Sequence, residues 1–145
     1  FEVTTIAFDP FITSHEMEKN NVKKVTFENI LSLADIISIH VPFNNETKYL
    51  FDKKIFKKMN NKPIIINSSR GGIINEIDLL EAYKNNYVSG FALDVYEHEP
   101  VNKIFLKNIT NDMNCILSPH IAGVTEEANT RVSEFIMNKT NEFFS

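Results

Sequence analysis

Short apolar runs alternate along the chain with longer segments in which apolar residues recur every three or four positions. This alternation is typical of β-strands joined by crossover helices. Within the runs apolar residues occupy successive positions, which favours parallel strands in a sheet covered on both faces. We therefore expect an α/β fold with helices on each side of the sheet. The runs predict five strands, at residues 3–8, 36–41, 64–67, 91–95 and 115–118.

Residues that can cap a helix precede the helical segments. Thr26, Asp52 and Asn75 each stand directly before such a segment, and their side-chain oxygens can accept the free N–H groups of a first turn. The segment after Asp52 is expected to be helical over residues 53–59. A long closing helix is predicted from Thr125, with Glu126 and Glu127 in a first turn that favours negative charge.

Composition narrows the class of protein. A chain of 145 residues that is 43% hydrophobic can bury one core. Its net charge of −4 and the absence of a basic stripe argue against nucleic acid as a partner. No apolar run approaches the roughly 20 residues of a membrane-spanning helix. With one cysteine, Cys115, neither an intrachain disulfide nor a zinc-ligand pattern can form, so we expect no metal and a soluble, cytoplasmic protein.

The organisation along the chain indicates a single unit. Repeats, low-complexity stretches and Gly/Ser linkers are not seen in the sequence, so a second domain is not predicted. The first residue is Phe1, directly inside an apolar run, and we expect the chain to begin within a domain. Residues 1–145 are interpreted as part of one domain.

Polar residues follow every predicted strand. Ligands of open parallel α/β sheets bind outside the carboxyl ends of the strands, so these residues are the candidates for chemistry. Along the chain they are Asp9-Pro10, His40-Val41-Pro42, Asn67-Ser68-Ser69-Arg70-Gly71-Gly72, Asp94-Val95-Tyr96-Glu97-His98-Glu99-Pro100 and Ser118-Pro119-His120-Ile121-Ala122-Gly123.

The last three of these segments, in this order and at these intervals, resemble the D-isomer-specific 2-hydroxyacid dehydrogenase family. The resemblance extends over essentially the whole chain. It implies a Rossmann-type doubly wound parallel sheet. It also implies NAD-dependent hydride transfer at carbon 2 of a small 2-hydroxy or 2-keto acid.

The resemblance assigns catalytic roles to Arg70, Glu99 and His120. Arg70 would hold the substrate carboxylate with paired hydrogen bonds, although it is also compatible with an ordinary surface or helix-cap arginine. His120 would be the acid/base, because histidine exchanges its proton near neutral pH and a carboxylate neighbour favours its charged form. Its partner would be Glu99, not Glu97. A packed strand-end histidine is the alternative, and a spacing of 21 residues does not establish contact.

Cofactor positions follow from the same resemblance. Asp9 would accept hydrogen bonds from the adenosine ribose and so select NAD over NADP, although Asp-Pro is also a common turn opener. His40, Val41 and Pro42 would form the wall beside the adenine. The nicotinamide side would be lined by Ser68, Ser69, Arg70 and His120, Asp94 would be the carboxylate that holds the carboxamide, and Gly123 would allow close backbone approach.

One part of the family pattern is missing. The glycines are Gly71, Gly72, Gly90 and Gly123, so the G-x-G-x-x-G phosphate loop and the strand before it are absent. In the strand order 3-2-1-4-5-6 the absent strand is central, and we expect an incomplete sheet with a gap. Unpaired strand edges invite a strand from another chain, so we expect a fragment, an incomplete gene product, or a homo-oligomer that fills the gap by strand exchange. We expect the chain by itself not to turn over substrate.

Several functions remain open at this point. Phosphoglycerate dehydrogenase, an enzyme of serine biosynthesis, is the favoured subtype, with glyoxylate/hydroxypyruvate reductase as the alternative. The alternatives outside the enzymes are a non-catalytic dinucleotide-binding module and an inactive fragment.

Overall fold

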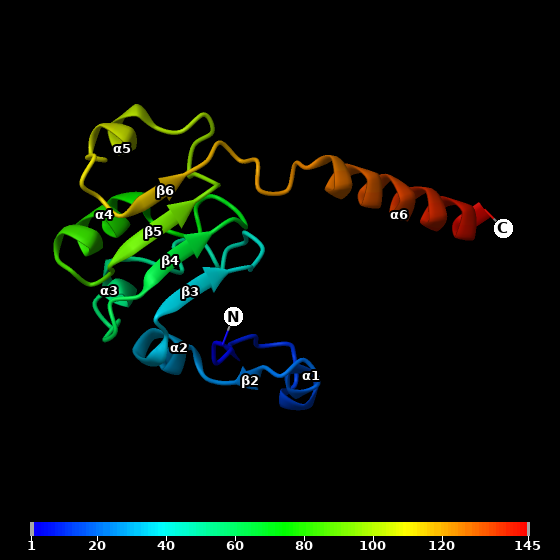
Figure 1. The fold of residues 1–145 in the computed structure, drawn as a ribbon, viewed down its shortest axis with the longest axis horizontal. Coiled ribbons are helices and arrows are strands. Elements are labelled where there is room, and N and C mark those ends of the chain that lie inside the picture. The colour runs from blue at the N-terminus through cyan, green and yellow to red at the C-terminus, as the bar shows by residue number, and fades with distance from the viewer. Residues whose placement is uncertain (1, 145) are drawn as a thin grey trace.

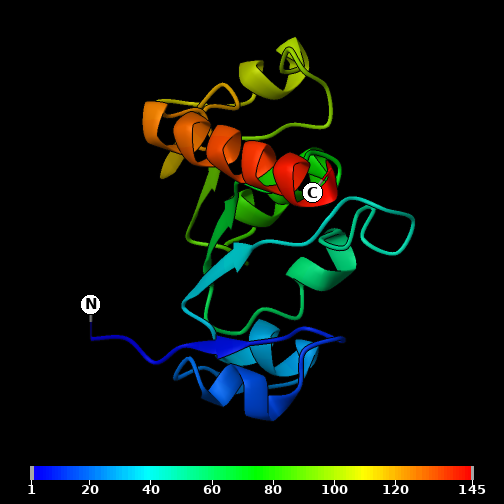
Figure 2. The ribbon, with the colours of Figure 1, turned by 90° about the vertical axis from the view of Figure 1, so that its right-hand side faces the viewer.

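The computed structural model describes residues 2–144, so Phe1 and Ser145 lie outside the described residues. It contains two parallel sheets (Figures 1 and 2). Strand β1 (Ile6–Ala7) pairs with β2 (Lys23–Lys24). The larger sheet has four parallel strands side by side in chain order, β3 (Ile36–Ile39), β4 (Ile64–Asn67), β5 (Gly90–Leu93) and β6 (Cys115–Leu117). The expected parallel α/β class is confirmed.

Helices connect the strands, and the predicted caps start three of them. Thr26 caps α2 (Phe27–Leu33), Asp52 caps α3 (Lys53–Phe56) and Asn75 caps α4 (Glu76–Lys84). Each cap side chain accepts a backbone N–H of the first turn. The closing helix, α6 (Glu126–Phe144), follows Thr125, whose hydroxyl accepts the N–H of Ala128.

Three short elements were not predicted, and several predicted elements are shorter than expected, including the strands predicted at 36–41 and 115–118, which end at Ile39 and Leu117. The unpredicted elements are α1 (Ser14–Glu18), β2 and α5 (Lys103–Lys107), which are too short to show a period. Helix α3 ends at Phe56 instead of residue 59. The first predicted strand is reduced to Ile6–Ala7, because only these residues pair with β2.

The core lies on one face of the four-stranded sheet. Side chains of alternate strand residues, among them Ile37, Ile65 and Phe91, pack there with Phe56 of α3 and Leu79 of α4. The other face is open, since Ile36 is 58% and Ile116 71% exposed. The expectation that both faces are covered is therefore wrong for the described residues. The successive apolar positions of β3 and β6 include side chains that residues 2–144 leave uncovered.

The predicted interruption of the sheet lies between β1 and β3. Within residues 2–144, β1 pairs only with β2, and β3 pairs only with β4, so each has one free edge. The small sheet of β1 and β2 lies beyond the β3 edge of the larger sheet in both views (Figures 1 and 2).

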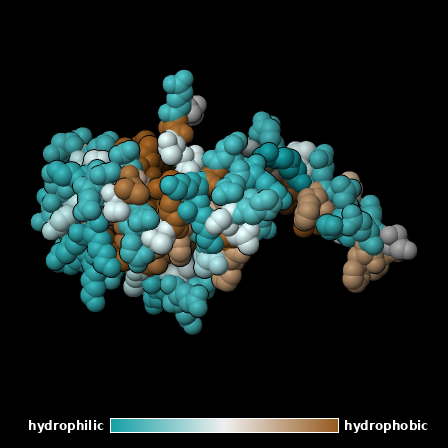
Figure 3. All heavy atoms as spheres, turned by 90° about the horizontal axis from the view of Figure 1, so that it is seen from below, coloured by the Kyte–Doolittle hydropathy of each residue, from teal (hydrophilic) through white to brown (hydrophobic). Residues whose placement is uncertain are grey.

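Helix α6 projects from the body and contributes nothing to the core. None of its residues, all of which are described, is buried, and Val132, Phe135 and Ile136 are each about three-fifths exposed. Apolar side chains also reach the surface of the body (Figure 3). Among residues 2–144, no helix has both the length and the apolar character needed to cross a membrane.

Candidate active site

The carboxyl ends of β3 to β6 bring the predicted site segments to one edge of the sheet. Because the four strands are parallel and adjacent, the loops that follow them are neighbours at this edge. His40 follows β3, Arg70 lies in the loop after β4, Asp94 follows β5, and His120 lies beyond β6.

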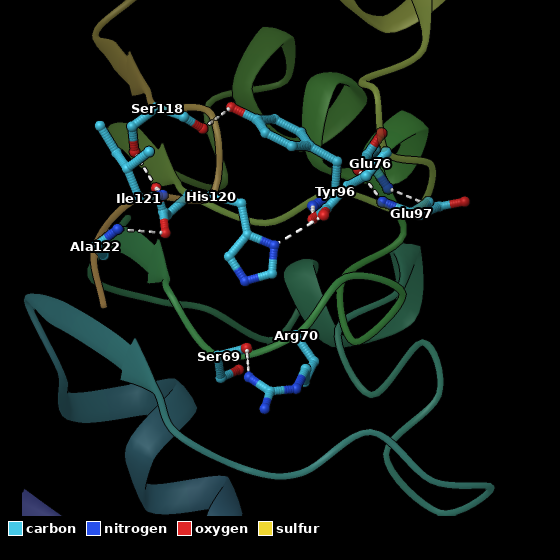
Figure 4. A network of polar contacts seen from close by, with 11 residues as sticks. Ser69, Arg70, Glu76, Tyr96, Glu97, Ser118, His120, Ile121 and Ala122 are labelled. Atoms are coloured by element: carbon cyan, nitrogen blue, oxygen red, sulfur yellow. Dashed lines mark hydrogen bonds and ion pairs between the residues drawn. The ribbon is translucent and has the colours of Figure 1, made fainter. Parts of the chain in front are cut away.

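His120 and Glu99 are in direct hydrogen-bond contact. The imidazole Nδ1 lies 2.8 Å from Glu99 Oε2, and both side chains are partly exposed (Figure 4). The hydrogen bond to His120 is the main reason that the pKa of Glu99 lies below its ordinary value. Because an ionised carboxylate only accepts, Nδ1 carries the proton and Nε2 is left for another partner. The contact that the 21-residue spacing left open is present.

Asp94 holds the turn that presents His120. Its Oδ1 accepts hydrogen bonds from the Ser118 hydroxyl at 2.6 Å and the Ile121 N–H at 2.9 Å, and its Oδ2 accepts the Ala122 N–H at 2.9 Å. Burial raises the pKa of Asp94, but these hydrogen bonds outweigh it, so the pKa lies below its ordinary value. The Asp94 carboxylate therefore holds residues on both sides of His120 in the sequence.

The backbone of His120 itself is in an unusual conformation. Its φ of 56° lies in the left-handed region, which non-glycine residues rarely adopt. Such a conformation costs of the order of 1 kcal/mol and persists only where neighbouring contacts impose it. The hydrogen bonds to Asp94 supply those contacts, and they turn the ring toward the loop that carries Ser69 and Arg70 (Figure 4).

The Ser68–Arg70 loop is shaped by a buried amide that the sequence analysis did not select. Asn67, 2% exposed, accepts the N–H and the hydroxyl of Ser69 and donates to the carbonyl of Arg70. Arg70 is exposed, and its Nη1 donates to the Ser69 carbonyl at 2.6 Å. Within the described residues no carboxylate pairs with Arg70, so its guanidinium can accept an outside anion.

The Arg70 loop and the Glu99 loop are in close contact. A Cβ on Gly71 would lie 1.8 Å from the carbonyl oxygen of Tyr96, so only glycine fits at this contact. The Tyr96 hydroxyl lies 2.9 Å from the carbonyl of Ser118, which links the same loop to the turn of His120. Neither Gly71 nor Tyr96 was selected from the sequence, because the partners of both are backbone atoms.

The predicted adenosine-side residues lie at strand ends but are separate from the His120 cluster. Asp9 Oδ1 accepts the N–H groups of Phe11 and Ile12, so part of its carboxylate closes its own turn, while its Oδ2 has no hydrogen bond in the described residues. His40 is exposed, with Nε2 2.8 Å from the Ser38 hydroxyl. Val41 is half-buried and Pro42 exposed. These positions fit a ligand that extends along the sheet edge.

Two further predictions have a more limited outcome. Ser68 is exposed and Ser69 half-buried, so Ser68 is the more accessible of the two. A Cβ on Gly123 would meet no atom within 4 Å, so no described residue requires glycine there. The close approach expected at Gly123 remains a prediction about a ligand.

Fold and site together define a class. A histidine bonded to a carboxylate, beside an arginine that has no ion pair within residues 2–144, lies at the carboxyl edge of a parallel sheet, an arrangement suited to proton transfer on a small anionic substrate. No group of three or more His, Cys, Asp or Glu side chains in residues 2–144 is arranged to hold a metal ion.

Comparisons with known proteins agree with this class. The family model for the D-isomer specific 2-hydroxyacid dehydrogenase NAD binding domain matches residues 1–122. The D-3-phosphoglycerate dehydrogenase of Bacillus subtilis (strain 168) is 39% identical over 99% of this chain and 27% of its own length. The D-lactate dehydrogenase of Staphylococcus epidermidis is 36% identical over 72% of this chain and 35% of its own length. A glyoxylate reductase structure from Paecilomyes thermophila superimposes with a TM-score of 0.81 at 29% identity, covering 94% of this chain and 40% of that one.

The chain belongs to the family of NAD-binding domains of D-isomer specific 2-hydroxyacid dehydrogenases. The expected family, the Rossmann-type fold and NAD as the family's cofactor are thereby confirmed. The chain spans about a quarter to a third of the length of these curated relatives.

Proposed function

We propose that the chain supplies the nicotinamide half of the active site of an NAD-dependent D-2-hydroxyacid dehydrogenase. The observation that carries the proposal is the 2.8 Å contact between His120 Nδ1 and Glu99 Oε2. It fixes the imidazole with Nε2 available, which is what a general acid/base requires. The residues 1–145 act as part of one NAD-binding domain.

In the direction of oxidation, His120 Nε2 takes the proton of the substrate hydroxyl while the hydride leaves carbon 2. NAD, when bound, supplies the nicotinamide that accepts this hydride. Glu99 stabilises the resulting imidazolium, since its depressed pKa keeps it ionised. In reduction, the same Nε2 returns the proton to the keto oxygen.

Arg70 binds the carboxylate of the substrate. A planar guanidinium donates two parallel hydrogen bonds to a carboxylate, and Arg70 has no competing ion pair in the described residues. The Arg70 guanidinium also polarises the keto group of the substrate. A neutral substrate would leave this cation without its partner, so 2-hydroxy acids are favoured over simple alcohols.

The favoured substrate is a phosphoglycerate-like 2-hydroxy acid, because two of the similar proteins are D-3-phosphoglycerate dehydrogenases. Such a substrate would place the protein in serine biosynthesis. A glyoxylate or hydroxypyruvate substrate is the second candidate, supported by the structural likeness to a glyoxylate reductase. The functional unit is proposed to be a cytoplasmic homo-oligomer.

Deuterium transfer tests the proposal. NADH that carries deuterium on the reactive carbon is incubated with the protein and, in turn, 3-phosphohydroxypyruvate, hydroxypyruvate, glyoxylate, pyruvate and 2-oxoglutarate. In an oligomer that fills the gap in the sheet, the expected result is a D-2-hydroxy acid with deuterium at carbon 2 for at least one substrate, whereas the isolated chain is expected to give none. His120→Ala should lose the transfer and keep NADH binding in a calorimetric titration. A wild-type protein that binds NADH without transfer to any of these acids would support a non-catalytic module instead.

A further inference from the structure

Two glutamates outside the proposed catalytic set lock the Glu99 loop onto helix α4. Glu76 is the first residue of α4, and Glu97 lies two residues before Glu99. The backbone N–H of Glu97 donates to Glu76 Oε1 at 2.6 Å, and the backbone N–H of Glu76 donates to Glu97 Oε1 at 2.9 Å. Each carboxylate therefore accepts the main-chain donor of the other residue, as Figure 4 shows.

A third loop joins this pair. The Tyr49 hydroxyl donates to Glu97 Oε2 at 3.1 Å, and the Tyr49 N–H donates to the carbonyl of Gly72 at 2.8 Å. The charge of Glu97 is the main reason that the pKa of Tyr49 lies above its ordinary value. The loops after β3, β4 and β5 are thus tied together around the Glu97 carboxylate.

The arrangement retains two carboxylates side by side in a poorly hydrated place. Glu76 is only 6% exposed. Burial raises the pKa of Glu76, and the charge of Glu97 raises it further against the opposing hydrogen bond from the Glu97 backbone. An apolar contact at this place would avoid the free-energy cost of burying a carboxylate. What the glutamates provide instead is a fixed position for a backbone segment.

We propose that Glu76 and Glu97 are positioning residues that hold Glu99 at hydrogen-bonding distance from His120. These contacts fix the segment just before Glu99, because Glu97 is held through both its backbone and its side chain. Glu99 Oε1 in turn accepts the N–H of Tyr96 at 3.3 Å, so residues 96 to 99 move as one turn. We call the reciprocal hydrogen bonds between Glu76 and Glu97 the clamp. Its role in catalysis rests on the proposed function, whereas its structural effect on Glu99 does not.

Reach and charge can be separated at residue 97. Glu97→Gln keeps the length of the side chain and an acceptor oxygen but removes the charge, and its amide can donate to the Tyr49 oxygen. Glu97→Asp keeps the charge but is one carbon too short to reach the N–H of Glu76. A positioning role predicts that the glutamine variant preserves the Glu99–His120 contact and the aspartate variant loses it. If only the charge of Glu97 mattered, the aspartate variant would behave like the wild type and the glutamine variant alone would differ.

The readout is the pKa of Glu99, followed by carboxyl carbon NMR in the intact protein. In the wild type and in Glu97→Gln and Glu76→Gln the pKa should lie below the ordinary glutamate value, because the hydrogen bond to His120 is retained. In Glu97→Asp and Glu76→Ala it should return toward the ordinary value of about 4.3. Glu81→Ala, which removes an exposed glutamate of the same helix paired with Lys53, is the matched control and should leave Glu99 unchanged.

The amide spectrum of each variant reports whether the fold is intact. A depressed Glu99 pKa in folded Glu97→Asp would overturn the positioning role, and so would a Glu99 pKa raised equally by Glu97→Gln. Because the titration needs neither NADH nor substrate, its result is independent of the deuterium-transfer assay. A protein without transfer activity but with the predicted titrations would retain the clamp and lose the proposed function.

Discussion

At the scale of single residues, the site depends on how His120 is held. Its left-handed backbone and its ring are fixed by different carboxylates, Asp94 through the turn and Glu99 through Nδ1. Both carboxyl groups have pKa values below their ordinary ranges, because both accept hydrogen bonds in their ionised forms. The imidazole is therefore oriented before any substrate arrives, which reduces the reorganisation needed for proton transfer.

Asp94→Asn should destabilise the protein by about 2 kcal/mol, because an amide nitrogen would face one of the backbone donors that the carboxylate now accepts. The stabilisation by Asp94 is present above the unfolded-state pKa of about 3.9 and is lost as the pH falls through the lower folded-state value. Urea unfolding at pH 7 measures the change. Asp112→Asn, at an exposed position, is the control, and equal stability of the two variants would contradict the role of Asp94.

The candidate residues that could be identified from sequence were those that stand in recognisable motifs. His120, Glu99 and Arg70 stand in motifs with matching intervals, and the structure brings His120 and Glu99 into contact. Asn67 and Tyr96 could not be found in the same way, because they hold backbone carbonyls and N–H groups whose positions depend on the fold. A polar residue at the end of an apolar run is the weak signal that pointed toward Asn67.

At the scale of elements, the loops after the strands are packed against one another. Gly71 allows the Arg70 loop to lie against Tyr96, while Glu76 joins helix α4 to Glu97. These contacts determine how the Arg70 loop lies relative to His120 and Glu99. The sheet supplies the common edge, and the loop contacts supply the geometry.

Gly71→Ala should lower the free energy of unfolding by about 1–3 kcal/mol, since its Cβ would overlap the Tyr96 carbonyl and force the two loops apart. Gly123→Ala is the matched control, because open space surrounds that position and the change should stay within about 0.5 kcal/mol. Chemical denaturation of both variants gives the comparison. A neutral Gly71→Ala would show that the loops do not need this contact.

Glu76→Gln should change how stability depends on pH. A raised carboxyl pKa stabilises the folded state below the unfolded value of about 4.3, and this contribution is lost as the pH rises through the folded value. Glutamine does not ionise, so the free energy of unfolding of the variant should increase relative to that of the wild type as the pH rises above about 4. Parallel unfolding curves at several pH values test this, and a constant difference would argue against a buried, titrating Glu76.

Helices with a cap residue and strands with β-branched runs could be predicted from sequence, because both signals are local. Strand β4 was predicted at its observed bounds, and the caps of α2, α3 and α4 were correct. Elements α1, β2 and α5 were missed because they are each five residues or fewer and depend on tertiary contacts. The open sheet face could not be anticipated, since apolarity in a strand does not reveal what covers it.

At the scale of the whole molecule, the sheet is divided and two apolar surfaces are uncovered. Strands β1 and β3 each keep one free edge within the described residues, and one face of the larger sheet and helix α6 are exposed. Free edges and apolar faces of this kind favour association with further polypeptide.

The 145-residue chain should accordingly associate in solution. Light scattering is expected to give a molar mass that is a multiple of 16.7 kDa, because strand exchange between copies would satisfy the free edges. Dilution should shift the mass toward a single chain if exchange is reversible. A folded species of single-chain mass at all concentrations would contradict association through these edges.

The most direct test of the account compares turnover with NADH binding in His120→Asn. Both quantities are measured on the same samples of the protein, using NADH and the 2-keto acid that the wild type reduces best. The account predicts that kcat falls by about 10²- to 10⁴-fold, because the proton donor is removed, while the Kd for NADH changes little. Turnover equal to that of the wild type would contradict the assignment of His120 as the acid/base.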